Sequence, residues 1–102
     1  MESLIEKLNK YYIRTKGKKL NATYSTLLQK SEDELTADEE LIYRNRVEPN
    51  MDYFIDTMYR IFVEEGRPLD AWREAVLQDT SIINGIAKKV VVRAIRDQEM
   101  GG

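Results

Sequence analysis

The residue types that most often carry out catalysis or bind metals are missing from this chain of 102 residues. It has no cysteine and no histidine, which excludes disulfides, thiol nucleophiles and imidazole acid–base chemistry and removes the usual zinc ligands. Serine, threonine and lysine remain as nucleophiles, but none has an activating base at a recognisable spacing. We therefore expect no catalytic residues, no metal site and no cofactor. We interpret the chain as a non-catalytic protein-interaction module, an adaptor, an assembly factor or a stoichiometric inhibitor of a larger complex, with binding of nucleic acid or a nucleotide as the alternative.

A basic loop with tyrosines around it is one candidate binding site. The cations of Lys16, Lys18 and Lys19 could neutralise phosphates, and tyrosine rings offer planes on which bases stack. The full candidate set for binding nucleic acid or a nucleotide is Tyr12, Arg14, Lys16, Lys18 and Lys19. The spacing of a P-loop is absent, and Tyr11 and Tyr24 lie on the apolar faces of their predicted helices, which favours core packing.

The last predicted helix is the other candidate binding site. Its apolar residues fill an arc of about 140°, and its basic residues gather on another arc of similar width. Three interpretations remain open: a core helix with a solvated basic back, a helix that also docks on a partner protein or a second copy, or a basic face on nucleic acid. The candidate docking residues are Lys88, Lys89, Val91, Val92, Arg93, Ile95 and Arg96. We expect self-association through this helix.

Charge is distributed unevenly along the chain. Residues 1–30 hold seven Lys or Arg and two Glu, whereas residues 31–56 hold nine Asp or Glu and two Arg. This pattern predicts faces of opposite sign. The acidic residues of 32–40 could imitate a phosphate backbone, which gives a third hypothesis, a nucleic-acid mimic. Further along, Arg60 stands four residues from both Asp56 and Glu64, and this spacing predicts ion pairs within one helix.

Helical periodicity dominates the sequence and places these candidate sites. It predicts helices over 3–15, 21–30, 36–65, 68–78 and 81–98. Capping signals support four of the starts: Ser3 with Glu6, Asn21, Thr36 with Glu39, and Thr80 or Ser81. Ser31 with Glu34 is a competing capping signal, and we expect only one of these two boxes to start a helix.

Pro49 is the main ambiguity in this assignment. Proline lacks an amide hydrogen and clashes with the carbonyl four residues earlier, so it should end or kink a helix. An apolar stripe nevertheless continues from Val47 to Phe62. We therefore predict one long helix kinked near Asn45, with two separate helices as the alternative.

The chain is thus predicted to be all-α, a compact single-domain bundle of four to five helices over 1–98, with a frayed tail at 99–102. No run of 18 apolar residues is present, and the first residues lack the apolar core of a signal peptide, so we expect a cytoplasmic protein without a membrane partner. In size and composition alone, it resembles accessory proteins of phages and mobile elements.

Overall fold

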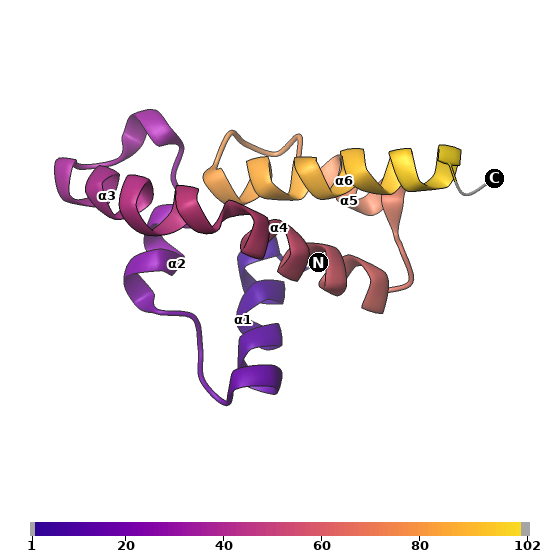
Figure 1. The fold of residues 1–102 in the computed structure, drawn as a ribbon, viewed down its shortest axis with the longest axis horizontal. Helices are drawn as coiled ribbons and strands as arrows, with labels where there is room; N and C mark the ends of the chain where they lie inside the picture. Colours follow the sequence, from indigo (N-terminus) through magenta and orange to yellow (C-terminus); the bar gives the residue numbers. More distant parts are fainter. Residues whose placement is uncertain (1, 101–102) are drawn as a thin grey trace.

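The first two helices are joined by the basic loop. In the computed structural model, which describes residues 2–100, α1 covers Leu4–Lys16 and α2 covers Ala22–Leu28 (Figure 1). The hydroxyl of Ser3 accepts from the Glu6 amide at 3.3 Å, and the side chain of Asn21 accepts from the Thr23 amide at 2.8 Å. Gly17 ends α1 with a φ of 72°, a conformation that suits glycine. Both predicted N-caps are confirmed.

Both of the competing capping boxes form, but only the second starts an α-helix. Glu34 accepts from the Ser31 amide at 3.0 Å, and this box opens a single 3₁₀ turn over Glu32–Glu34. Thr36 and Glu39 exchange the same kind of bonds and start α3, Ala37–Ile42, as predicted. The acidic side chains here therefore serve a local purpose, because they satisfy amides at two helix starts.

Helical backbone crosses Pro49 without a break. After α3 the chain widens into a π turn over Tyr43–Val47, tightens into a 3₁₀ turn over Glu48–Asn50, and continues as α4, Met51–Glu64. The π turn contains Asn45, and the axis of the run changes direction between α3 and α4 (Figure 1). One long, kinked helical run is confirmed, and a π turn is a known cause of such a kink.

The chain then reverses through two residues of positive φ, Gly66 and Arg67, into α5, Leu69–Ala75. Pro68 is the N-cap of this helix, which therefore begins one residue later than predicted. The last helix, α6, runs over Ile82–Met100, and the hydroxyl of Ser81 accepts from the Asn84 amide at 3.3 Å. This helix continues past its predicted end at 98, while residues 101–102 lie outside the described part.

With the run 37–64 taken as one bent helix, residues 2–100 form five helical segments in an all-α bundle, as predicted. The most extensive helix–helix contact joins α4 and α6, and α6 also packs on α5, α1 and α2 (Figure 1). Fully buried side chains from every part of the chain meet here: Leu8, Leu27, Leu28, Val47, Met58, Phe62, Trp72 and Val90. None of the helices in the described residues is both long and apolar enough to cross a membrane.

Candidate functional site

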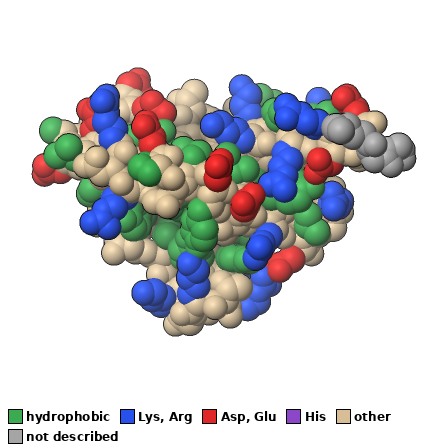
Figure 2. Space-filling view, viewed as in Figure 1, with side chains coloured by type: hydrophobic (Ala, Val, Ile, Leu, Met, Phe, Trp, Pro, Cys, Tyr) green, Lys and Arg blue, Asp and Glu red, His purple; other side chains and the backbone are tan. Residues whose placement is uncertain are grey.

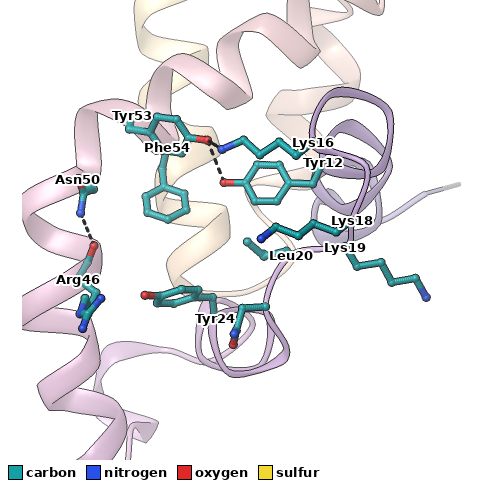
Figure 3. A pocket seen from close by; sticks show the side chains of 11 residues that line it. Tyr12, Lys16, Lys18, Lys19, Leu20, Tyr24, Arg46, Asn50, Tyr53 and Phe54 are labelled. Atoms are coloured by element: carbon teal, nitrogen blue, oxygen red, sulfur yellow. Dashed lines mark hydrogen bonds between the residues drawn. The ribbon is translucent and has the colours of Figure 1, made fainter.

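The basic loop closes one side of a surface pocket of about 500 Å³. The C-terminal end of α1, the loop and the start of α2 form one wall, and the run from the π turn into α4 forms the other. We call this the tyrosine–lysine pocket. Its lining residues are Tyr12, Lys16, Lys18, Lys19, Leu20, Asn21, Tyr24, Arg46, Asn50, Tyr53 and Phe54 (Figure 3).

The lining of the pocket carries four cations and no carboxylate. Lys18, Lys19 and Arg46 form no ion pair with any carboxylate of residues 2–100. The surrounding surface has the same character, since Lys and Arg gather near the α1–α2 loop, whereas Asp and Glu gather near α3 (Figure 2). The predicted separation of charge is therefore present, and the pocket lies at its positive end.

Lys16 bridges the two walls. Its ammonium group lies 4.9 Å from the ring centroids of both Tyr12 and Tyr53 and donates a hydrogen bond to the Tyr53 hydroxyl. Tyr12 also donates to the Tyr53 hydroxyl, at 3.3 Å. We call these three residues the Lys16 bridge. Because the bridge links the end of α1 to α4, it fixes the width of the pocket at this edge.

The bridge changes the acidity of its two phenols in opposite directions. Burial and the hydrogen bond to Tyr53 raise the pKa of Tyr12 above its ordinary value. Burial alone would raise the pKa of Tyr53, but the hydrogen bonds from Lys16 and Tyr12 outweigh it and lower that pKa. Tyr53 is therefore the phenol in this pair that ionises first as the pH rises.

Two rings of the pocket are accessible and two form its floor. Tyr12 and Phe54 are buried, whereas Tyr24 is half-buried and Tyr53 is 41% exposed. In Figure 3 the side chain of Lys18 extends toward the pocket-lining side chains, and that of Lys19 points away from them. Lys18 is therefore the loop lysine that faces the other pocket-lining side chains.

The pocket brings together four of the five residues predicted for it from the sequence, all except Arg14. That residue forms an ion pair with Glu64 and lies over the ring of Tyr11, with 5.4 Å from its guanidinium carbon to the ring centroid. Its part in binding nucleic acid stays a prediction that the pocket does not support. Helical geometry explains the difference, because Arg14 is two positions from both Tyr12 and Lys16 and so projects from another side of α1.

Arg46 is the cation of the pocket that was not predicted from the sequence, and Asn50, Tyr53 and Phe54 of the same wall were not predicted either. Arg46 comes from the acidic part of the chain, and the π turn places it opposite the basic loop. The Asn50 side chain donates to the Arg46 carbonyl at 2.7 Å, which helps hold this irregular turn. A signal was present, because Arg46, Asn50 and Tyr53 follow the spacing of one helical face.

Comparisons with known proteins do not extend this description. No protein-family model matches the chain, and neither the curated proteins nor the solved structures that were searched gave a match.

The candidate docking face on α6 is only partly accessible. Val91 is 6% exposed and belongs to the core, so its assignment as a contact residue is wrong: helices pack on α6 from several sides and cover this part of the apolar arc. Ile95 is half-buried, and Val92 is 46% exposed. The exposed basic residues of this face are Lys88, Lys89, Arg93 and Arg96. Docking through the remaining face stays a prediction.

Ion pairs across helices replace those predicted within α4. Arg93 of α6 binds Asp56 at 2.9 Å and lies over the ring of Tyr59, so it ties α6 to α4. Glu64 binds Arg14, as described above. Arg60 consequently forms no ion pair with either predicted partner, nor with any other carboxylate among the described residues.

The acidic residues of 32–40 are largely used within the fold. The amide of Thr36 and the ammonium of Lys30 lower the pKa of Glu39, because both stabilise its carboxylate. Glu32 accepts from the Tyr43 hydroxyl at 2.9 Å, and burial together with this bond raises the pKa of Tyr43 to about 12. Glu40 pairs with Arg44. The nucleic-acid mimic remains an untested hypothesis, and these contacts account for most of the acids without it.

Proposed function

We propose that this protein is a non-catalytic binding protein and that the tyrosine–lysine pocket takes a nucleotide unit, a phosphate with a planar base attached. The observation that carries the proposal is the lining itself: four cations, three tyrosines and one phenylalanine surround a single pocket that has no carboxylate. Clusters of cations without acids attract phosphate, and exposed tyrosine rings stack on bases of any sequence.

The parts of a nucleotide correspond to different parts of the pocket. Lys18 and Arg46 lie on opposite walls, so the pocket offers a cation to an anionic ligand on each side. Tyr24 and Tyr53 present the accessible rings, and the amides of Asn21 and Asn50 supply hydrogen bonds near them. A volume of about 500 Å³ falls within the range of small-ligand pockets.

We also propose that the protein binds its ligand in the cytoplasm. The absence of cysteine fits a reducing environment. We therefore assign the protein's binding role to the cytoplasm.

Chemical-shift perturbation with adenosine monophosphate tests the proposed function directly. We expect the shifts to cluster at Lys18, Tyr24, Arg46 and Tyr53, with adenosine alone or inorganic phosphate alone giving weaker effects. Arg46→Ala should weaken binding at least fivefold, because it removes one of the four cations that line the pocket. Raising the salt concentration should weaken it further.

Arg73→Ala is the matched control, since Arg73 is an exposed arginine of α5 that does not line the pocket and its loss changes the net charge equally. Equal effects of the two substitutions would mean that general charge attraction alone accounts for binding. Shifts centred on α6 would reject the pocket as the site.

A further inference from the structure

The tyrosine–lysine pocket has a neighbour on the other side of the Lys16 bridge. This second pocket, of about 290 Å³, is lined by Tyr11, Thr15, Lys16, Tyr53, Asp56, Thr57 and Arg60. Both pockets lie between α1 and α4, and both include Lys16 and Tyr53. The Lys16 bridge therefore separates two adjoining pockets.

The second pocket repeats the chemistry of the first. It holds two cations, Lys16 and Arg60, and two tyrosines, Tyr11 and Tyr53. Its one carboxylate, Asp56, is neutralised by Arg93 at 2.9 Å. The pair of pockets thus offers cations on both sides of an exposed aromatic ring, which is the arrangement found in sites that follow a nucleic-acid backbone.

One helical face carries five of the seven residues that line the two pockets from the helical run around Pro49. Arg46, Asn50, Tyr53, Thr57 and Arg60 follow one another at intervals of four, three, four and three residues. Arg46 and Arg60 are fourteen positions apart, and fourteen steps at the rise of an α-helix span about 21 Å. Stacked nucleotides in a strand rise ~3.4 Å each, so this length corresponds to about six of them. A free mononucleotide would occupy only part of it.

We propose that the ligand is a single strand of nucleic acid several nucleotides long, which lies along this face from Arg46 to Arg60 and passes over the Lys16 bridge. The inference rests on the proposed function and specifies its ligand. The cations of the two pockets favour a polyanion, and the tyrosine rings favour a polyanion whose bases are free to stack on them. A duplex keeps its bases stacked on each other, and an acidic peptide has no bases, so neither matches both features.

Competition binding with the full chain tests this length dependence. A fluorescein-labelled octamer of deoxythymidine is displaced by unlabelled thymidine monophosphate and by strands of two, four and eight nucleotides. We expect affinity to rise at least tenfold between two and eight nucleotides. Arg60→Ala should weaken octamer binding about fivefold and leave monophosphate binding unchanged, whereas Arg46→Ala should weaken both. The control Arg73→Ala should change neither.

The outcomes separate the two proposals. If the monophosphate binds as tightly as the octamer and Arg60→Ala has no effect, the inference fails and the proposed function survives. If neither ligand binds, both fail. Competition by an octaglutamate peptide or an eight-base-pair duplex as strong as that of the octamer also overturns the inference. An octamer of uridine shows whether RNA or DNA binds more tightly, and tight binding of either supports a single strand.

Discussion

Tyr12 and Tyr53 share a hydrogen bond of 3.3 Å although 41 positions separate them in the chain. Tyr12 comes from α1 and Tyr53 from α4, so the bond joins the two walls of the candidate site directly. Lys16 binds the same Tyr53 hydroxyl and lies against both rings. Stability and ligand binding therefore depend on one small group of atoms.

Tyr53→Phe separates these two contributions. The substitution keeps the ring for stacking but removes the acceptor of Tyr12, so we expect the free energy of unfolding to fall by about 1 kcal/mol. Urea denaturation measures the loss. In a double-mutant cycle, Tyr12→Phe should lose a similar amount, and the double variant should lose less than the sum. Strict additivity would show that the two hydroxyls are not coupled.

Tyr53→Phe should also release Lys16 for a phosphate, since its hydrogen-bond acceptor is gone while its ring partner remains. Binding of the labelled octamer should therefore be retained, whereas Tyr53→Ala, which removes the ring as well, should weaken it severalfold. Fluorescence polarisation measures both. An equal loss in the two variants would assign the effect to the hydroxyl and not to the ring.

Alkaline pH should weaken anion binding before the protein unfolds. The pKa of Tyr53 lies below its ordinary value, whereas those of Tyr12 and Tyr43 are raised, so this phenol should become negatively charged ahead of these two and repel a phosphate. Folding lowers this pKa, so the ionisation by itself stabilises the folded state as the pH rises. Absorbance at ~295 nm follows phenol ionisation. The early step should disappear in Tyr53→Phe, and its persistence there would assign it to another tyrosine.

Glu65→Ala should destabilise the fold more than its neighbour Glu64→Ala. Trp72 is 0% exposed, and its indole donates to Glu65 at 2.8 Å, while Lys7 pairs with the same carboxylate at 3.1 Å. Removing Glu65 leaves a buried donor unpaired, which costs about 1–3 kcal/mol. Glu64 takes part in an exposed pair worth about 0–1 kcal/mol. Urea unfolding followed by tryptophan fluorescence measures both, and equal losses would contradict the assignment.

Self-association through α6 is tested at Val92. This side chain is 46% exposed among basic residues, and it is the apolar position of the predicted docking set that remains open to solvent. If the helix pairs with a second copy, Val92→Glu should shift a dimer toward the monomer without lowering the melting temperature. Light scattering after gel filtration measures the mass. A monomer of 12.0 kDa for the unaltered chain at tens of micromolar would reject self-association.

Local signals account for much of what the sequence predicted. The caps at Ser3, Asn21, Thr36 and Ser81 depend on side chains within three residues of the amides that they satisfy, so a linear reading finds them. It was harder to predict which side chains of α6 are buried. The apolar arc of that helix is wide, and the sequence does not show how many neighbours cover it. Val91 therefore looked available although it lies in the core.

The candidate site was predictable on one wall only. Lys16, Lys18 and Lys19 are close in sequence, so their shared location required no knowledge of the fold. Arg46 comes from a distant segment of opposite average charge, and only the packing of that segment against α1 and α2 brings it to the pocket. The ion pairs predicted for Arg60 do not form for the same reason: the fold brings Asp56 and Glu64 to arginines of other helices.

The wide turn over Tyr43–Val47 has a consequence for changes in chain length. A turn of this kind accommodates one residue more than an ordinary helix, and each residue of an α-helix advances the rotation by about 100°. Deleting one residue there would convert the π turn into an ordinary α-helical turn. The residues before the deletion would then be rotated by about 100° relative to those after it, so Arg46 and Tyr53 would no longer face the same way. Point substitutions in this segment should thus be tolerated far better than the deletion of one residue. The deletion would turn the pocket-lining side chains before it and those after it toward different sides of the helix.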